Sequence, residues 1–414
     1  MAGAVRVLLV AEGSGGHLIP ALEVASSLAQ RGAQATLLYV QRPQLGELLS
    51  SMLASVAREG VEVVPLAMGP SAPSGRGPSI VRRARFWWRR LGQAWRVWGI
   101  ARERLRRQTP DIVVGFGGWV CVPVTFAARR RRIPMLLHEQ NVSLGQANRF
   151  LMRWADEVAL SFPWRPSSSS RDRAARRRAG LDTALAWPRR SRPDGRPSWV
   201  VTGLPIRRAI GTVSRQDAAQ QLGCDPSTPT ILVLGGSQGA QAINRSVCRA
   251  LAVLAPEERA AWQFIHLTGQ ADCAWVRQAY ADAGLKNAWV QPYFSDMAYA
   301  YALADVVIAR AGASTIAELA RCGKPALLIP YPYAHAHQRE NVRLVEAVGG
   351  GVWLEETTLT PQRLAQLLRT LVTDARLRGI MGEQMHTLAT PAATEQLAGA
   401  ICRLAKKGDA AHSS

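Results

Sequence analysis

The sequence predicts an α/β protein made of two doubly wound, Rossmann-like domains that face a common cleft. Three observations support this prediction. Short, continuously apolar runs alternate with segments of helical periodicity along almost the whole chain. Such runs suit strands buried on both faces of a parallel sheet, and the helices between them complete βαβ units. The alternation stops once, near the middle, and 414 residues are enough for two domains.

The predicted strands fall into two sets on either side of that interruption. The first set lies at 5–11, 35–40, 61–66, 111–116, 134–138 and 157–161. The second set lies at 198–202, 230–235, 263–268, 288–291, 305–309 and 326–330. Segment 164–198, rich in Ser, Pro and Arg, is typical of a basic linker or insert without a core. We therefore expect one domain at 1–163, a second at 199–390, and a helix at 391–410 that packs back on the first.

Composition narrows the class of protein. Hydrophobic residues make up 48% of the chain and charged residues 20%, which is ordinary for a globular protein. The six cysteines are scattered without a CxxC pair, which indicates neither a disulfide framework nor a zinc site and fits a reducing cytosol. No apolar stretch approaches the ~20 residues of a membrane-spanning helix, so we expect a protein that is soluble or lies on a membrane surface.

The positive charge is local. Three Arg-rich segments, 76–107, 129–132 and 165–198, carry the whole formal net charge of +21. Local charge of this kind favours an anionic partner. Within 80–108, large apolar residues fall at helical spacing with Arg between them, at Trp87, Trp88, Leu91, Trp95 and Trp98. This pattern predicts peripheral association with an anionic membrane surface, and the alternative is that the Trp face packs on its own domain.

A glycine-rich turn, Gly13-Ser14-Gly15-Gly16-His17, lies between the first predicted strand and a helix. Glycines let backbone N–H groups approach an anion, and a helix N-terminus favours negative charge. The alternative is a tight turn without a ligand. The turn lacks the third glycine of a dinucleotide fingerprint. An imidazole titrates near pH ~6.5, so His17 is a candidate general base.

The second predicted domain offers three further candidate sites. A glycine-rich turn at 235–239 contains Ser237, which could bond a phosphate oxygen. The helix that begins near Ser314 could hold a diphosphate at its N-terminus, with Glu318 one turn further for a pair of ribose hydroxyls. Gln338 and Asn341 share one helix face, and their amides match the needs of sugar hydroxyls. His335 and His337 lack a third ligand nearby, so we expect no metal site.

One more pair of segments lies at predicted strand ends in the first domain. A glycine pair precedes Trp119, which suits close approach and stacking on a sugar, and 138–141 follows the next strand. The alternative for both is ordinary loop and core.

These motifs resemble, in order and spacing, the MurG family of peptidoglycan N-acetylglucosaminyltransferases. The resemblance covers about 5–400 and includes, besides both glycine turns, segments 114–119, 138–141, 203–207 and 313–318. It implies the two-domain glycosyltransferase B fold and no cofactor. It also implies transfer of GlcNAc from UDP-GlcNAc to undecaprenyl-pyrophosphoryl-MurNAc-pentapeptide, with inversion, at the cytoplasmic side of the cell membrane. Other cell-wall enzymes are implied partners.

The resemblance also implies a role for individual residues. Arg207 and Ser237 would contact the UDP phosphates, Phe294 would lie beside the uracil, and Glu318 would bind the ribose. Gln338 and Asn341 would hold the GlcNAc. On the acceptor side, the resemblance implies the first glycine turn, with Ser14, Gly15 and Gly16, together with Asn141 and Asn148. The stacking role suggested above for Trp119 adds that residue to the acceptor side.

The chain departs from the family pattern at a few positions. Glu12 and Ser14 stand where Gly and Thr are usual, Trp119 replaces a Tyr, and Ala311 stands where Ser is common. Glu12 puts a negative charge near a proposed pyrophosphate site, unless it points away or acts as the base. We therefore expect His17 as the base, with Glu12 as the alternative.

Two other classes of function stay open at this point. Another enzyme of the same fold, such as a different UDP-sugar lipid glycosyltransferase or a UDP-GlcNAc epimerase, would share most of these motifs. A basic nucleic-acid-binding protein would share the Arg content. The sequence has no helix-turn-helix, zinc or RNA-recognition signature, so we expect no nucleic-acid partner.

Overall fold

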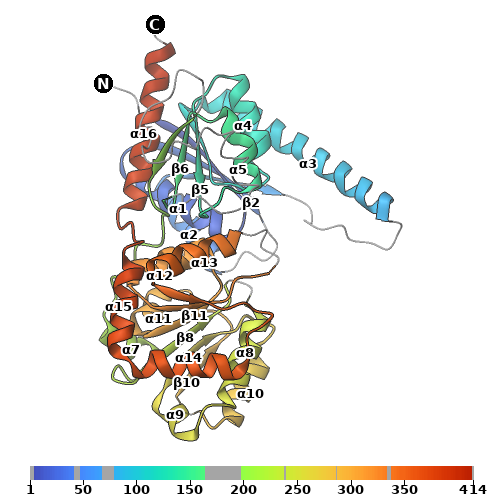
Figure 1. Ribbon diagram of the computed structural model, residues 1–414. Helices are drawn as coiled ribbons and strands as arrows, with labels where there is room; N and C mark the ends of the chain where they lie inside the picture. Colours follow the sequence, from blue (N-terminus) through green and yellow to red (C-terminus); the bar gives the residue numbers. More distant parts are fainter. Residues whose placement is uncertain are drawn as a thin grey trace. The chain divides into compact units, whose positions relative to one another are not determined.

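The computed structural model describes residues 4–41, 47–67, 79–163, 197–236, 239–285, 287–332 and 337–412. The chain divides into two compact units. Unit 1 comprises Met1–Gln140, Leu144–Pro205 and Ala392–Ser414, and unit 2 comprises Asn141–Ser143 and Ile206–Pro391. Each unit has its own parallel sheet covered by helices, which confirms the predicted α/β fold class (Figure 1).

Unit 1 contains a seven-stranded sheet in the order β3-β2-β1-β4-β5-β6-β7. All its neighbouring strands pair in parallel. The strands are β1 Arg6–Ala11, β2 Gln34–Gln41, β3 Glu62–Ala67, β4 Ile112–Gly115, β5 Met135–Glu139, β6 Glu157–Leu160 and β7 Ser198–Val201. Six of the seven coincide with the first predicted set to within a few residues.

The helices of unit 1 cover both faces of this sheet. They are α1 Gly15–Gln30, α2 Glu47–Arg58, α3 Ser79–Gln108, α4 Cys121–Arg130, α5 Gln146–Leu151, the 3-10 turn η1 Met152–Trp154 and α16 Ala393–His412. Along β1, Leu9 packs in a core with α1 and α16, whereas Leu8 packs in a second core with α3 and α4. This double burial is the reason why β1 is apolar at successive positions.

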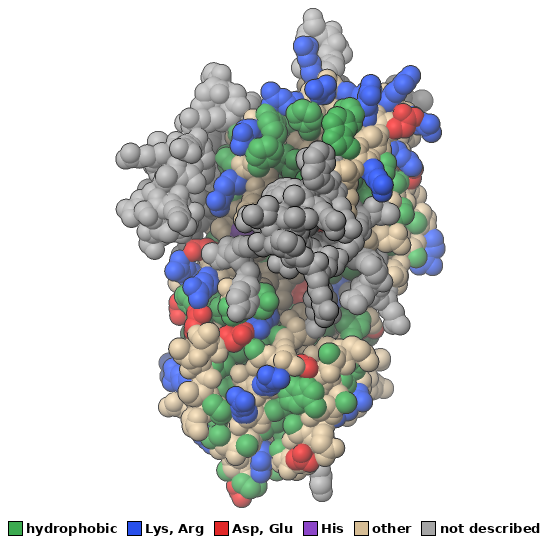
Figure 2. Space-filling model, turned by 90° about the vertical axis from the view of Figure 1, so that its right-hand side faces the viewer, with side chains coloured by type: hydrophobic (Ala, Val, Ile, Leu, Met, Phe, Trp, Pro, Cys, Tyr) green, Lys and Arg blue, Asp and Glu red, His purple; other side chains and the backbone are tan. Residues whose placement is uncertain are grey.

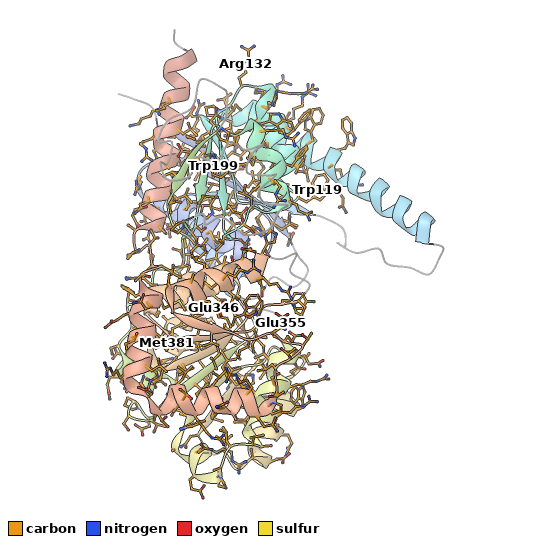
Figure 3. All side chains as sticks on the ribbon, in the orientation of Figure 1. Trp119, Arg132, Trp199, Glu346, Glu355 and Met381 are labelled. Carbon is orange, nitrogen blue, oxygen red and sulfur yellow. The ribbon has the colours of Figure 1, made fainter. Side chains whose placement is uncertain are left out.

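Strand β7 was predicted to open the second domain, and that prediction is wrong. It pairs in parallel with β6, with Val201 opposite Leu160. Trp199 packs in the core of unit 1, and Figure 3 shows its side chain among the strands of that unit. An apolar run carries no local signal of which sheet it joins, because strand pairing is decided by distant residues. The basic segment 164–198 therefore precedes the last strand of unit 1 rather than the first strand of unit 2.

Unit 2 contains a six-stranded parallel sheet in the order β10-β9-β8-β11-β12-β13. The strands are β8 Thr230–Leu234, β9 Gln263–Leu267, β10 Ala288–Gln291, β11 Val306–Ala309, β12 Ala326–Leu328 and β13 Gly351–Trp353. The helices are α7 Arg215–Leu222, α8 Gln241–Leu251, α9 Pro256–Ala261, α10 Cys273–Asp282, α11 Met297–Leu303, α12 Ala313–Cys322, α13 His337–Val348, α14 Pro361–Thr373 and α15 Ala375–His386. The three-residue edge strand β13 was not predicted, because it is too short to give a pattern.

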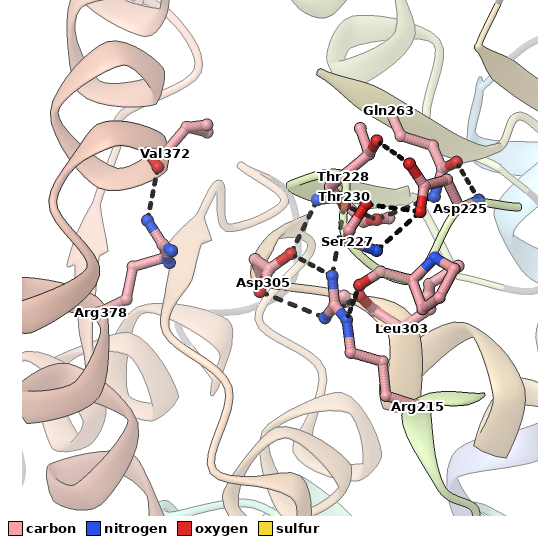
Figure 4. A network of polar contacts seen from close by, with 12 residues as sticks. Arg215, Asp225, Ser227, Thr228, Thr230, Gln263, Leu303, Asp305, Val372 and Arg378 are labelled. Atoms are coloured by element: carbon pink, nitrogen blue, oxygen red, sulfur yellow. Dashed lines mark hydrogen bonds and ion pairs between the residues drawn. The ribbon is translucent and has the colours of Figure 1, made fainter. Parts of the chain in front are cut away.

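A polar network ties together the amino ends of the central strands of unit 2 (Figure 4). Arg215 bonds the Leu303 carbonyl at 2.7 Å and the Asp305 carboxylate at 2.9 Å. Asp305 in turn accepts from the Thr230 backbone N–H at 2.8 Å. This edge of the sheet is therefore filled with internal hydrogen bonds, and in open parallel sheets ligands bind at the opposite, carboxyl edge.

None of the helices in the described ranges combines the length and apolarity that crossing a bilayer requires.

The core of unit 2 contains a fully buried histidine, His266 on β9. Its Nδ1 lies 3.0 Å from the Tyr280 hydroxyl and its Nε2 lies 3.0 Å from Asn244 Oδ1. Burial lowers the pKa of His266 from 6.5 to about 3, and outweighs the opposite effect of the Asp272 carboxylate. Between these two pH values the unfolded chain binds a proton that the folded chain does not bind.

Acidification should therefore destabilise unit 2 within that window. Above pH 6.5 the free energy of unfolding is not reduced by this histidine. Below pH 6.5 it falls by up to about 1.4 kcal/mol for each pH unit, because only the unfolded chain takes up the proton. We expect the calorimetric unfolding midpoint to fall between pH 7.5 and pH 5, and to fall less in His266→Gln. Identical acid sensitivity of variant and wild type would contradict this assignment.

Candidate functional site

In unit 1 the candidate residues gather at the carboxyl ends of three adjacent strands. Strands β1, β4 and β5 are neighbours in the sheet. The glycine turn at 12–17 follows β1, the segment 116–119 follows β4, and Gln140 follows β5. Parallel strands present their carboxyl ends at the same edge, so residues more than 100 positions apart in the sequence meet there.

His17 is oriented by a neighbour on its own turn. Helix α1 begins at Gly15, and the hydroxyl of the preceding Ser14 lies 2.8 Å from His17 Nδ1. If Nδ1–H donates to Ser14, then Nε2 carries the lone pair and can accept a proton. The imidazole lies beside Gly117, where an added Cβ would be 3.1 Å from Nε2. The His17 ring is therefore held by Ser14 beside Gly117.

Glu12 packs against the turn after β4. An added Cβ on Gly118 would lie 2.5 Å from Glu12 Oε2, and Gly118 has a φ of +84°. Position 118 therefore requires glycine, because of its left-handed backbone and because a side chain would overlap Glu12. Burial, and after it the Glu12 carboxylate, raises the pKa of Cys121 to about 12. The carboxylate of Glu12 thus lies beside residues 117–121, within the same cluster as His17.

A buried pair supports this cluster from β5. His138 is fully buried, with Nε2 3.2 Å from the Gly203 carbonyl and Nδ1 3.2 Å from Gln140 Nε2. Gln140 Nε2 also donates to the Phe116 carbonyl at 2.8 Å. Burial lowers the pKa of His138 from 6.5 to about 4, so it stays neutral near pH 7. His138 is therefore a structural residue of unit 1 that holds the segment after β5.

The other acceptor-side candidates differ in how they are placed. Gly15 and Gly16 form the first turn of α1, and a Cβ on Gly16 would meet nothing within 4 Å in the described part of the chain. Trp119 is half-buried. Asn148, which is predicted to face the acceptor, makes its contacts within unit 1. Its side chain is 2% exposed and donates to the His138 carbonyl at 3.1 Å and to Glu139 at 2.9 Å.

In unit 2 a buried carboxylate is held from two sides. Glu318 on α12 is 8% exposed. Tyr301 donates from its hydroxyl to Glu318 Oε2 at 2.9 Å, and Arg207 Nη2 donates to Oε1 at 3.2 Å. Arg207 Nη1 also donates to the Ser295 carbonyl at 2.6 Å. Arg207 and Glu318 were predicted as site residues and lie together, whereas Tyr301 was missed because nothing in the local sequence pairs it with Glu318.

The N-terminus of α12 and the second glycine turn are the candidate anion sites of unit 2. Gly312 precedes α12, and the buried Ser314 hydroxyl has no hydrogen-bond partner among the described residues. The N–H groups of the first helical turn offer donors to an anion. Ser237 lies outside the described residues, but its neighbours Gly236 and Gly239 have φ values of +89° and +75°. Both candidate anion sites follow strands, β11 and β8, at the carboxyl edge of the sheet.

The remaining donor-side candidates have partners within unit 2. Phe294 lies edge-on to Trp289, with ring centroids 5.0 Å apart. Gln338 Oε1 accepts from the Tyr331 backbone N–H at 2.8 Å, so its amide is already oriented.

Asn341 has several partners within unit 2. It is fully buried and donates to the Ala311 carbonyl at 3.0 Å and to Asn141 Oδ1 at 3.2 Å. Its own oxygen accepts from the Val142 N–H at 3.0 Å, and segment Asn141–Ser143 clusters with unit 2. The roles of Asn341 toward a sugar and of Asn141 toward an acceptor stay predictions, and in this structure the two side chains contact each other. A side-chain amide can bond backbone N–H and carbonyl groups as readily as it bonds sugar hydroxyls.

No group of three His, Cys, Asp or Glu side chains in the described segments is arranged to hold a metal ion.

Comparison with known proteins assigns the chain to a family. The glycosyltransferase family 28 N-terminal domain matches residues 7–160, and the glycosyltransferase family 28 C-terminal domain matches residues 230–396. A relative from Halorhodospira halophila is 36% identical over 397 residues, covering 96% of this chain and 97% of the relative. It is named UDP-N-acetylglucosamine--N-acetylmuramyl-(pentapeptide) pyrophosphoryl-undecaprenol N-acetylglucosamine transferase. The crystal structure of Acinetobacter baumannii MurG matches with a TM-score of 0.67 and 29% identity, over 96% of this chain and 99% of that one. The chain belongs to the MurG family.

Other comparisons place the MurG family within a wider fold. A relative from Desulfotalea psychrophila with the same name is 33% identical and covers 96% of both chains. The UDP-GlcNAc 2-epimerase from Neisseria meningitidis, solved with UDP-GlcNAc, matches with a TM-score of 0.64 at 13% identity, over 96% of this chain and 100% of that one. That likeness shows a shared fold. Arg207 and β7 lie between the two matched domains of the MurG-family chain.

Proposed function

We propose that this protein transfers GlcNAc from UDP-GlcNAc to the 4-hydroxyl of MurNAc in undecaprenyl-pyrophosphoryl-MurNAc-pentapeptide, with inversion. The substrates follow from the name of relatives that match over nearly the full chain. The structural observation that supports the mechanism is the 2.8 Å contact between the Ser14 hydroxyl and His17 Nδ1, because in the tautomer in which Nδ1–H donates to Ser14 the Nε2 atom can accept a proton. The N-terminal unit supplies the acceptor-side groups and the C-terminal unit the donor-side groups.

In the proposed mechanism the acceptor hydroxyl attacks the anomeric carbon as UDP leaves from the opposite face. His17 takes the hydroxyl proton, with Glu12 as the alternative base. The first turn of α1, with Ser14, Gly15 and Gly16, binds the acceptor pyrophosphate, and Trp119 lies beside the acceptor sugar. Negative charge develops on the departing diphosphate, and oriented donors at such a position are each worth about 10²–10³ in rate.

The donor roles are assigned to residues of unit 2. Ser314 at the start of α12, together with Ser237, binds the diphosphate. Glu318 binds the ribose hydroxyls, Phe294 lies beside the uracil, and Gln338 binds the GlcNAc. Arg207 is assigned to the diphosphate by the family resemblance, and its bonds to Glu318 and to the Ser295 carbonyl also brace the carboxylate that binds the ribose.

One assay tests the proposed function against its alternatives. Purified protein is mixed with radiolabelled UDP-GlcNAc, with and without the lipid-linked acceptor. We expect label in the lipid fraction only when the acceptor is present. Conversion of UDP-GlcNAc to another nucleotide sugar without acceptor would favour an epimerase. Salt-sensitive RNA binding without turnover would favour a nucleic-acid-binding protein.

We also propose that unit 1 binds peripherally to an anionic membrane on its cytoplasmic side. Among the described side chains of this unit, three aromatic ones are exposed: Trp95 by 68%, Phe126 by 42% and Phe150 by 42%. Arg130 lies over the Phe126 ring and Arg153 over the Phe150 ring. Figure 2 shows hydrophobic side chains gathered among Lys and Arg on one face of this unit. Exposed aromatic rings bordered by Arg are typical of surfaces that lie on anionic lipid.

Helix α3 contributes one of its described tryptophans to this surface and packs the other on the core of unit 1. Trp98 packs against the core of unit 1, whereas Trp95 is exposed and meets Trp98 edge-on at 5.4 Å. The side chains of Trp87, Trp88 and Leu91 lie outside the described residues. The alternative of a Trp face packed on its own domain therefore holds for Trp98 and not for Trp95.

Removing the charge of this surface should weaken lipid binding. Each Arg near an anionic surface contributes about 1 kcal/mol, so replacing Arg129, Arg130 and Arg153 by Ala should lower vesicle affinity by roughly 100-fold at low salt. Co-sedimentation with vesicles of anionic and of zwitterionic lipid measures this. A matched control is Ile380→Ala, which changes an exposed apolar residue of unit 2. Unchanged binding of the triple variant to anionic vesicles would contradict the proposal.

A further inference from the structure

We propose that Tyr301 is a positioning residue that fixes the Glu318 carboxylate and thereby makes the enzyme select ribonucleotide over 2′-deoxyribonucleotide donors. This inference rests on the proposed function, because it assumes that a nucleotide ribose meets Glu318. It adds a residue, and a selectivity, that the motifs of the sequence do not indicate.

The first step is the geometry around the carboxylate. Tyr301 is fully buried on α11, and its hydroxyl donates to Glu318 Oε2 at 2.9 Å. Arg207 donates to the other oxygen at 3.2 Å. A carboxylate has about four lone-pair positions, so after these two bonds each oxygen keeps one position for another donor. Two vicinal hydroxyls of a ribose are two such donors, whereas a 2′-deoxyribose supplies one.

The second step is the cost of losing the tyrosine hydroxyl. The end torsion of a glutamate side chain is broad, so the carboxylate plane is not fixed by its rotamer alone. Tyr301 and Arg207 hold the two oxygens from different elements, and together they set that plane. Burial, with a smaller contribution from the Glu318 charge, raises the pKa of Tyr301 well above 10, so the phenol remains a donor at all working pH values.

The third step links this pair to the neighbouring base. Arg207 also bonds the Ser295 carbonyl at 2.6 Å, directly after Phe294. The Arg207 guanidinium group thus supports two things at once: the Glu318 carboxylate and the segment proposed to lie beside the uracil. A displaced Glu318 would disturb recognition of the ribose first, since Arg207 keeps its second contact to Ser295.

The test compares two buried tyrosines of unit 2. Tyr301→Phe removes the hydroxyl that contacts Glu318, and Tyr280→Phe removes one that contacts the core residue His266. Steady-state kinetics are measured with UDP-GlcNAc and with its 2′-deoxyuridine analogue. A hydrogen bond to a charged group contributes more to stability than a bond between neutral groups. We therefore expect KM for UDP-GlcNAc to rise about 10-fold in Tyr301→Phe, while kcat changes less than about twofold.

The decisive readout is the selectivity ratio. Wild type and Tyr280→Phe should prefer the ribo donor to the same degree, and Tyr301→Phe should lose most of that preference. Loss of stability alone would lower the unfolding midpoint of both variants without changing the ratio. If Tyr301→Phe does not fold, Tyr301→Met repeats the test with an apolar side chain of adaptable shape.

Two results would overturn the inference: an unchanged ratio in the folded Tyr301 variant, or an equal change in Tyr280→Phe. The proposed function fails separately, if the wild type transfers no GlcNAc at all. In that case calorimetric binding of UDP and of 2′-deoxy-UDP to the same three proteins still measures the selectivity. Equal affinities for the two nucleotides in the wild type would then also reject the role of Tyr301.

Discussion

Replacing His17 by Ala should lower kcat by about 10²–10⁴ and leave the dissociation constant for UDP-GlcNAc within about twofold. The imidazole lies at the acceptor-side cluster of unit 1, whereas the proposed donor groups belong to unit 2. A lost base removes a contribution made in the transition state and not in donor binding. Turnover is measured with lipid acceptor, and donor affinity by calorimetry.

Two further variants separate the roles within this cluster. Ser14→Ala keeps the imidazole but removes the contact at Nδ1, so we expect a smaller loss than in His17→Ala. Glu12→Gln keeps the shape and removes the charge. If Glu12→Gln lowered kcat more than His17→Ala, then Glu12 would be the base. Parallel loss of turnover and donor affinity in His17→Ala would remove its assignment as a base.

Replacing Gly239 by Ala should weaken UDP binding by roughly 100-fold and lower the thermal stability of unit 2. The glycine has a φ of +75°, and an added Cβ would overlap the Thr268 carbonyl oxygen and lie 2.9 Å from Gly269 Cα. These obstacles are backbone atoms, so the turn itself must move. A misplaced turn no longer presents its N–H groups to the diphosphate. Calorimetric titration with UDP and a thermal melt measure the two effects.

Gly236 offers a matched control on the same turn. Its φ is +89°, but an added Cβ would meet nothing within 4 Å among the described residues. Gly236→Ala therefore carries the left-handed backbone cost of about 1–2 kcal/mol without the clash. We expect it to bind UDP more tightly than Gly239→Ala does. Equal losses in the two variants would show that space around Gly239 is not the cause.

Much of this architecture could be predicted from the sequence, because strands buried on both faces give continuous apolar runs. The glycine turn at 235–239 could be predicted because φ > 0 at Gly236 and Gly239, and the close approach of backbone to Gly239, restrict the residue type. Strand β7 was misassigned, because its apolar residues would suit either sheet. The pairing of β7 with β6, from Ser198 opposite Glu157 to Val201 opposite Leu160, decides the matter, and pairing depends on distant residues.

The site was harder to predict than the fold. His17, Glu318 and Arg207 could be selected from their chemistry and their motifs. Asn148 and Asn341 carry the amide expected of a sugar ligand, yet both are buried in contacts with backbone groups. Tyr301 is an ordinary helix residue in the sequence, and its importance arises from a contact across 17 positions that involves two different helices.

The position of α16 has a consequence for how the protein is made. Leu397 and Ile401 of this helix complete a core that includes Leu18 and Leu22 of α1. During translation, unit 2 emerges from the ribosome before α16 does, although unit 1 has begun first. Unit 1 therefore keeps the α1 side of its core exposed until residues 393–412 have left the ribosome, and exposed apolar surface of this kind is prone to aggregation.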